Sequence, residues 1–460
     1  MITIDRQRTA SDLVPHVDRL FDLSAGKIDA LNQRWDQSSG APVYTVTGTD
    51  QARGWTDWTQ GFQFGSSLLQ FDATGDTAFL AAGRTRTLAS MTPHLTHIGV
   101  HDHGFNTVST YGALWRLARE GRFEGSEWEL RYYELALRVS GAVQARRWTR
   151  LPDGGFIHSF NGAHSLFVDT IRSLRALALA HALGHVLLDE QDLRVSLLGR
   201  LVQHARATAA FSVYHGRGRD AFDVRGRVTH EAIFNVANGS FRSPSTQQGY
   251  SPFSTWTRGL AWAILGFAEQ LEFLATVDDE ALIEWSGRAA IEAWMLEAAR
   301  ATSDYYIAHA AAADGVPYWD TGAPGLAALG DWGGRAADPF NDVEPVDSSA
   351  AAIAAQGLLR LARVMAARAE DGSAYLQAGL RTLDTLFNPA GPYLATVPSH
   401  EGLLLHSVYH WPNGWDHVPA GARTPRGETS QWGDYHAREA ALYVARLATG
   451  APYLTFFGTP

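Results

Sequence analysis

Two aspartates lie in segments where a carboxylate is rarely found without a partner or a function. Asp169 interrupts residues 166–171 (LFVDTI), an apolar run with helical spacing, although aspartate is a poor helix former and is seldom buried alone. Asp102 lies in residues 101–105 (HDHGF), at the expected start of another helix. Two acids on separate helices, in a chain with 15 tryptophans and no cysteine, indicate acid–base chemistry on a sugar-like ligand.

Each aspartate also has a purely structural interpretation. Arg172 and Ser173 follow Asp169 by three and four residues on the same helical face, so a simple ion pair explains that acid equally well. Asp102 precedes a helix expected to begin near Gly104, and helix capping is the simpler explanation for that segment alone. The functional hypothesis for Asp169 requires a partly dry pocket and a second carboxylate nearby. Both would raise its pKa and keep it protonated near neutral pH, ready to donate.

Histidines surround Asp102, a composition that also occurs in metal sites. Residues 91–105 contain His94, His97, His101 and His103. This segment lacks the HExxH spacing, and the pair His230-Glu231 also lacks a second histidine four residues further on. We therefore expect neither a metal ion nor another cofactor.

Residues 248–267 combine a cation with aromatic side chains at the start of an expected helix. Arg258 and Trp262 are four residues apart, so the guanidinium can lie against the indole ring. Trp256 is near enough to the helix start to turn towards the same pocket. Together these side chains could hold a sugar that carries a carboxylate. The alternative is a pair of core tryptophans beside a surface arginine.

Composition narrows the class of protein. The chain has 460 residues, of which 45% are hydrophobic and 19% charged, so it can bury a large core. Its net charge of -10 and the lack of a dominant Lys/Arg cluster argue against nucleic-acid binding. The absence of cysteine excludes disulfides, zinc–thiolate sites and thiol nucleophiles. No run of about 18 apolar residues and no apolar signal-peptide core is present, so we expect a cytoplasmic protein that does not span a membrane.

Apolar residues recur mainly at helical spacing, and strand-like alternation is short, as at 43–46. The expected helices span 13–31, 78–91, 108–117, 128–139, 166–183, 187–211, 257–275, 281–299, 348–365, 375–386 and 437–448. Long loops rich in Gly, Pro, Trp and His lie at 54–65, 213–254, 314–346 and 397–430. Helices joined by alternating short and long connections predict one all-α domain, residues 1–460, folded as an (α/α) barrel. A helical solenoid is the competitor, although no internal repeat supports it.

Several segments, taken in chain order, resemble motifs of glycoside hydrolase family 88, the unsaturated glucuronyl hydrolases. The matching segments are WTQGF at 58–62, HDHGF at 101–105, FVDTIRSL at 167–174, residues 248–267, PYWD at 317–320, DSSAAAIAAQGLL at 347–359 and WGDY at 432–435. The resemblance extends from Trp58 to Tyr435, and the ordered series is much more specific than any one motif. It implies an (α/α)6 barrel, in agreement with the helix count.

The resemblance also implies a reaction and a substrate. Enzymes of this family hydrate the C4=C5 double bond of the unsaturated uronate that a polysaccharide lyase leaves at a nonreducing end. An aspartate protonates C4, water adds at C5, and the resulting hemiketal opens to release the neighbouring sugar. By motif position Asp169 looks like the proton donor, and also the group that activates the water, while Asp102 looks like the second essential acid near the ring hydroxyls. Positions that look like subsite residues are Trp58, His101, His230, Gln248, Trp256, Arg258 and Trp262.

The chain departs from the expected family pattern at two positions and leaves one loop unassigned. His103 stands where a less polar residue is expected, and Arg172 makes the Asp169 segment more polar. We expect the loop 397–430 to help bind the substrate carboxylate and the next sugar. The open alternatives are an unsaturated rhamnogalacturonyl hydrolase, an inverting glycosidase on the same barrel, and a sugar-binding barrel without catalysis. No feature of the sequence specifies an oligomeric state.

Overall fold

Six helical segments form a closed inner ring within residues 1–54, 57–452, 455 and 457, which are the residues described by this computed structural model. The inner segments are α2 (Gln60–Thr74), α5 with η4 and α6 (His103–Thr107, Val108–Gly112 and Ala113–Arg119), α8 with α9 (Thr170–Ser173 and Arg175–Ala182), α11 (Thr257–Leu274), α14 (Ser348–Ala367) and α16 (Gln431–Thr449). Each segment packs against the next, and α16 packs against α2. Because the ring closes, the fold is not an open solenoid.

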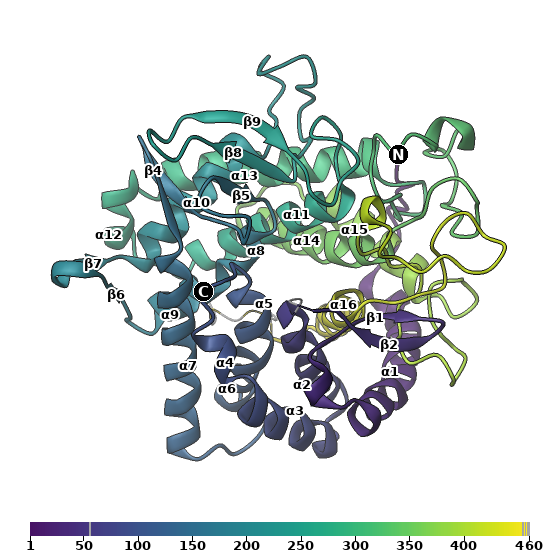
Figure 1. Cartoon of the computed structure of the whole chain (residues 1–460). Helices are drawn as coiled ribbons and strands as arrows, with labels where there is room; N and C mark the ends of the chain where they lie inside the picture. The colour runs from purple at the N-terminus through teal and green to yellow at the C-terminus, as the bar shows by residue number, and fades with distance from the viewer. Residues whose placement is uncertain (55–56, 453–454, 456, 458–460) are drawn as a thin grey trace.

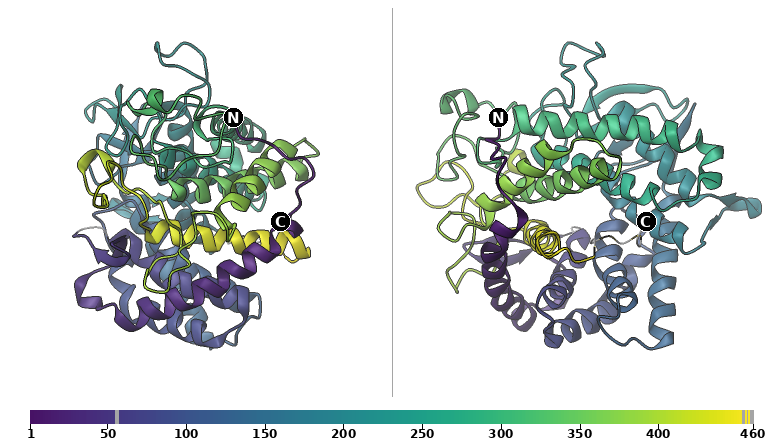
Figure 2. Two further views of the ribbon diagram at one scale, coloured as in Figure 1. Left: turned by 90° about the vertical axis from the view of Figure 1, so that its right-hand side faces the viewer. Right: turned by 180° about the vertical axis from the view of Figure 1, so that it is seen from behind.

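Six outer helices cover this ring in the same described part of the chain. They are α1 (Val14–Arg34), α3 (Thr77–Ser90), α7 (Glu127–Arg146), α10 (Leu197–Phe211), α13 (Arg288–Tyr305) and α15 (Ser373–Phe387). Each packs against the ring, for example α3 against α2 and α13 against α11. The helices surround a common centre in Figure 1, and a side view shows α1 and α16 side by side (Figure 2). The predicted (α/α)6 barrel is confirmed.

Burial distinguishes inner from outer helices. Every residue of α11 is buried, whereas α1 buries one stripe that includes Val17, Leu20 and Phe21. A helix that is apolar on all sides needs neighbours all round, and a one-sided helix needs only one layer beneath it. Burial on all sides therefore marks α11 as an inner helix, and one-sided burial marks α1 as an outer helix.

α14 is the one described helix that is long and apolar enough to cross a membrane by length and composition. An 18-residue stretch within Ser348–Ala367 has a mean hydropathy of 1.3, and 78% of that stretch is buried inside the protein. Its apolar surface is covered by α11, α15 and α16, so α14 is a core helix of the barrel.

α2 corrects the sequence analysis, which assigned residues 54–65 to a loop. Gly61 and Gly65 lie inside this helix at close helix–helix approaches. A Cβ atom on Gly61 would lie 2.5 Å from the Cα atom of Asn106, and one on Gly65 would lie 2.6 Å from the Ser109 carbonyl oxygen. These glycines serve packing against the neighbouring inner segment rather than a turn.

The segment 166–183 also differs from its prediction as one continuous helix. Leu166 and Phe167 belong to strand β5 (Ser165–Phe167), which pairs with β8 (Glu231–Phe234), and β8 pairs in turn with β9 (Phe241–Ser245), all antiparallel. Asp169 follows the strand and is the residue immediately before α8. The pairing partner comes from more than 60 residues further along the chain, so no local pattern could reveal it.

Short elements complete the described chain. The remaining strands pair as antiparallel hairpins: β1 (Pro42–Val46) with β2 (Thr49–Ala52), β3 (Trp148–Leu151) with β4 (Gly154–Ile157), and β6 (Leu187–Leu188) with β7 (Arg194–Val195). The predicted strand at 43–46 is therefore confirmed, whereas the predicted helix 187–211 begins only at Leu197. Two single-turn helices, α4 (Thr92–Leu95) and α12 (Asp279–Leu282), lie in connections.

Buried ion pairs join three of the inner segments at the barrel centre. Arg172 of α8 contacts Glu269 of α11 at 3.2 Å and Glu439 of α16 at 2.6 Å. Arg175 of α9 contacts the same two carboxylates at 3.5 and 3.9 Å. All four side chains are at most 2% exposed. Because each charge is buried, removing one partner leaves another charge without compensation.

We expect Arg172→Met to lower the free energy of unfolding by about 3–5 kcal/mol, since Glu269 and Glu439 would lose a buried partner. Arg131→Met is the matched control, because Arg131 is 76% exposed and pairs with Glu127 on the surface of α7. That control should change stability by no more than about 0.5 kcal/mol. Urea unfolding followed by circular dichroism measures both, and equal losses in the two variants would contradict the prediction.

Candidate active site

A cavity of about 450 Å³ opens at the end of the barrel where the inner helices begin. Of the nine predicted site residues, eight line it: Trp58, His101, Asp102, Asp169, Gln248, Trp256, Arg258 and Trp262. Their positions explain this convergence: Trp58 precedes α2, Asp102 precedes α5, Asp169 precedes α8 and Trp256 precedes α11. The barrel therefore gathers residues that are up to 204 positions apart in the sequence (58 to 262).

His101 lies between the two acids. Its Nε2 atom is 3.5 Å from Asp102 Oδ1 and 3.5 Å from Asp169 Oδ2. The side chains of His101, Asp102 and Asp169 are 1%, 9% and 14% exposed, so Asp169 is the most accessible of the three from the cavity. Ser173 and Gln144 both donate hydrogen bonds to the His101 carbonyl, at 2.7 and 2.9 Å, and hold this backbone in place.

The structural interpretations of the two acids are wrong. Asp102 occupies the N-cap position of α5, but its side chain makes no capping hydrogen bond. Arg172 is directed into the barrel centre, where it contacts Glu269 and Glu439 rather than Asp169. Both carboxylates are thereby left for the cavity and for His101.

The pKa values of His101, Asp102 and Asp169, called the trio below, contradict one prediction. Burial raises the pKa of Asp102; His101 opposes this shift and the charge of Asp169 adds to it. Burial also acts upward on Asp169, but the hydrogen bond and charge of His101 outweigh it and hold the pKa of Asp169 below its usual value. The predicted rise in the pKa of Asp169 is therefore wrong. Burial lowers the pKa of His101, yet Asp102 and Asp169 raise it overall.

Arg258 is a buried cation, 2% exposed, and not the surface arginine of the alternative interpretation. Its guanidinium donates to Asp347 at 3.0 Å, to Gln248 Oε1 at 2.7 Å and to the Tyr409 carbonyl at 2.7 Å. The predicted stacking on Trp262 does not form. The guanidinium lies instead between Trp256 and Trp432, 4.7 and 4.9 Å from their ring centroids. Arg258 thus fixes Gln248 and the long loop against α14.

His230 is the predicted residue that does not line the cavity. Its ring packs behind the wall, 4.5 Å from the ring of Phe167 and 4.6 Å from that of Trp256, measured between centroids. Its Nδ1 atom accepts hydrogen bonds from the backbone N–H groups of Gln247 and Gln248, at 3.0 and 3.3 Å. Burial lowers the pKa of His230 to about 4. A neutral His230 therefore supports the strand-to-helix connection that carries Gln248.

Aromatic rings form much of the cavity wall. Trp58 stacks on Trp432 with 5.2 Å between centroids and an interplanar angle of 24°, and it also contacts Phe105 at 5.9 Å. Phe105 in turn contacts Trp262 at 5.0 Å. Flat, rigid aromatic surfaces of this kind pack against the apolar faces of sugar rings.

The loop 397–430 contributes Tyr409, His410 and Trp415 to the cavity, in agreement with the expectation that this loop takes part. Asp416 fixes it by accepting hydrogen bonds from the backbone N–H groups of Tyr409 and His410. Further wall residues that the sequence analysis did not assign are His97, Gly99, Val100, Phe105, Phe160, Phe167 and Gln247. The aromatic and histidine content of the loops was the available signal, but it did not single out positions.

The two departures from the family pattern have structural explanations. His103 is 2% exposed, and its ring nitrogens contact Ser140 Oγ and the His97 carbonyl, each at 2.9 Å. Arg172 belongs to the ion pairs at the barrel centre. Neither residue lines the cavity. Among the described residues, the donor atoms of His101, Asp102 and Asp169 are close enough together to hold a metal ion.

Sequence comparison finds relatives that align with most of this chain. No protein-family model matches it. An unsaturated glucuronyl hydrolase of Bacillus sp. (strain GL1) is 28% identical over 86% of this chain and 89% of that enzyme. One from Formosa agariphila is 25% identical over 84% of this chain and 79% of its own length. An unsaturated chondroitin disaccharide hydrolase of Streptococcus pyogenes serotype M1 is 24% identical, over 84% and 81%.

Solved structures show the same fold. The crystal structure of the Bacillus sp. GL1 enzyme superposes with a TM-score of 0.69 at 23% identity, covering 94% of this chain and 97% of that one. An unsaturated glucuronyl hydrolase specific for heparin gives 0.70 at 20% identity, over 95% and 97%. The superposition shows that this chain has the same (α/α)6-barrel fold as these hydrolases. In sequence, the chain is similar to unsaturated glucuronyl hydrolases, in agreement with the resemblance to glycoside hydrolase family 88 that its ordered motifs predicted.

The position of His101 leads to a prediction about its titration. Asp102→Asn removes the larger of the two charge effects that raise the pKa of His101, so the pKa of this histidine should fall. The imidazole proton resonances of histidine-labelled protein, followed across pH, measure the change. Asp153→Asn, which alters an exposed acid outside the cavity, is the control. An unchanged His101 titration in Asp102→Asn would show that the two side chains are not coupled.

Proposed function

We propose that this protein is a hydrolase of unsaturated uronyl oligosaccharides produced by polysaccharide lyases. It hydrates the C4=C5 double bond of the terminal uronate and thereby releases the neighbouring sugar. The observation that carries the proposal is the pair Asp102 and Asp169 around His101 in an aromatic cavity. The names of the relatives, unsaturated glucuronyl hydrolase and unsaturated chondroitin disaccharide hydrolase, support the same substrate class.

Asp169 delivers the proton to C4 in this mechanism. His101 lowers the pKa of Asp169 and so favours its ionised form. A substrate carboxylate adds negative charge to the cavity and displaces water, and both effects raise the pKa of Asp169. The proton on His101 Nε2 then moves to the carboxylate of Asp169, which is the most accessible of the three side chains. A positioned acid with a pKa near the working pH is the effective form for such a transfer.

Protonation of C4 develops positive charge at C5 and the ring oxygen, and water then adds at C5. The ionised Asp169 left by the transfer accepts a proton from this water, and Asp102 stands on the other side of His101 to stabilise the charge. The hydrated product is a hemiketal, which opens and frees the neighbouring sugar. The glycosidic bond is therefore not attacked directly.

An inverting glycosidase fits the geometry less well. Such enzymes separate their two carboxyl groups by about 6.5–9.5 Å to admit a water molecule between them. Here donor atoms of His101, Asp102 and Asp169 all lie within 4.8 Å of one another. The relatives named for unsaturated glucuronyl and chondroitin substrates also favour the uronyl reaction over an unsaturated rhamnogalacturonyl hydrolase.

The decisive experiment follows the ultraviolet absorbance of the conjugated double bond in unsaturated glucuronyl disaccharides. The parent protein should abolish this absorbance, and Asp169→Asn should lower kcat by about 10²–10⁴-fold because it removes the general acid. Asp153→Asn is the matched control and should retain parent activity. Persistent absorbance across a panel of unsaturated disaccharides, or turnover of saturated glycosides instead, would overturn the proposal.

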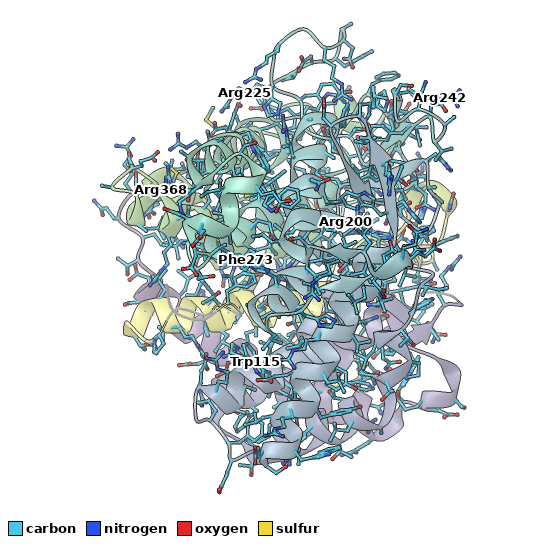
Figure 3. All side chains as sticks on the ribbon, turned by 90° about the vertical axis from the view of Figure 1, so that its left-hand side faces the viewer. Trp115, Arg200, Arg225, Arg242, Phe273 and Arg368 are labelled. Carbon is cyan, nitrogen blue, oxygen red and sulfur yellow. The ribbon has the colours of Figure 1, made fainter. Side chains whose placement is uncertain are left out.

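Arg258 should affect binding more than chemistry, because it positions Gln248 and Tyr409 rather than the acids. Arg258→Lys cannot reproduce the forked set of hydrogen bonds, so we expect KM to rise by about 10-fold with a smaller fall in kcat. Arg225→Lys is the control: Arg225 is 48% exposed and lies at the periphery of the molecule (Figure 3). A fall in kcat alone would show that Arg258 acts in the chemical step.

A further inference from the structure

The trio His101, Asp102 and Asp169 presents three donor atoms to one point of the cavity. His101 Nε2 lies 3.5 Å from one oxygen of each carboxylate, and one donor atom from each of the three residues lies within 4.8 Å of the other two. In a tetrahedral zinc site, bonds of about 2.0–2.2 Å place neighbouring ligand atoms about 3.3–3.6 Å apart. Two of the three edges therefore already have the length that zinc requires.

Two further observations show that these donors are available to an ion. His101 is 1% exposed, its Nδ1 atom and Asp169 Oδ1 lack a hydrogen-bond partner, and its Nε2 atom lies 3.5 Å from each carboxylate. Such buried polar atoms are costly to leave unsatisfied. The Asp169 side chain is partly exposed to the cavity, so rotation of its carboxylate can close the third edge, and the cavity leaves room for a water molecule as fourth ligand.

We propose that this trio binds a divalent zinc ion, which competes with the substrate for the same carboxylates. Zinc suits a mixed set of one imidazole and two carboxylates, whereas magnesium and calcium prefer oxygen ligands alone. The hydrogen bonds from Ser173 and Gln144 to the His101 carbonyl hold this ligand in position before the ion arrives. The bound ion is an inhibitor and not a cofactor, because it occupies the acids that the proposed reaction uses.

Zinc binding goes beyond the proposed function, and only its inhibitory effect rests on that function. The primary experiment is therefore calorimetric titration of zinc chloride into the metal-free full-length protein, which requires no turnover. We expect one saturable site whose affinity falls by at least about 10-fold in His101→Ala, since loss of a direct ligand exceeds the loss of a supporting contact. His164→Ala, an exposed histidine outside the cavity, should retain parent affinity.

Three further measurements test whether a loss of zinc affinity comes from the loss of a ligand. Circular dichroism establishes that His101→Ala is folded, and Asp102→Asn supplies a second ligand variant in which affinity should also fall. Cobalt chloride in place of zinc should give visible absorption bands typical of low coordination, which disappear in both variants. Zinc affinity that survives His101→Ala, or that is lost instead on His97→Ala in the same cavity, would overturn the assignment.

The inhibitory effect is tested separately with an unsaturated glucuronyl disaccharide. Zinc should raise KM without changing kcat, and excess chelator should restore the parent value. Calorimetric binding in a protein that turns over no unsaturated disaccharide would leave the zinc site intact and overturn the proposed function. Turnover that is insensitive to saturating zinc would overturn the competition.

Discussion

The ion pairs at the centre of the barrel are the interaction on which the rest of the structure depends. Arg172 and Arg175 share Glu269 and Glu439, so one buried cluster joins α8, α9, α11 and α16. The charge of the two arginines keeps the pKa of Glu439 below its usual value despite complete burial. Separating a buried ion pair leaves charges buried without a partner, which is strongly destabilising. The cluster therefore favours the arrangement of these helices in which all four charges are paired.

This arrangement also determines where the active site lies. Arg172 lies on α8, three residues after Asp169, which immediately precedes that helix, so the contact that fixes α8 in the barrel also fixes this acid. The cavity forms where the inner helices begin, and the loop 397–430 contributes to its wall. Hydrogen bonds from Arg258 to the Tyr409 carbonyl and from the His410 N–H group to Asp416 hold this loop in place. The polar core and the catalytic end of the barrel are thus parts of one structure.

His101 gives the two acids different properties. Each carboxylate is buried, and burial alone would raise both pKa values. The hydrogen bond and charge of His101 hold the pKa of Asp169 below its usual value, whereas the charge of His101 only partly offsets the rise that burial causes in the pKa of Asp102. Placing a titratable base between two acids lets a single protonation equilibrium respond to a charged substrate, which neither acid could do alone.

The sequence by itself determined the all-α barrel, the resemblance to a hydrolase family and eight of the residues that line the cavity. Apolar periodicity is a local property, so helices such as α1, α11 and α14 could be predicted, and ordered motifs identified Asp102, Asp169 and Arg258 without any contact being known. Only the tertiary structure decided what those residues touch. The strand before Asp169, the packing glycines of α2 and the place of His101 between two acids depend on partners far away in the chain, and electrostatic effects depend on distances that periodicity does not contain.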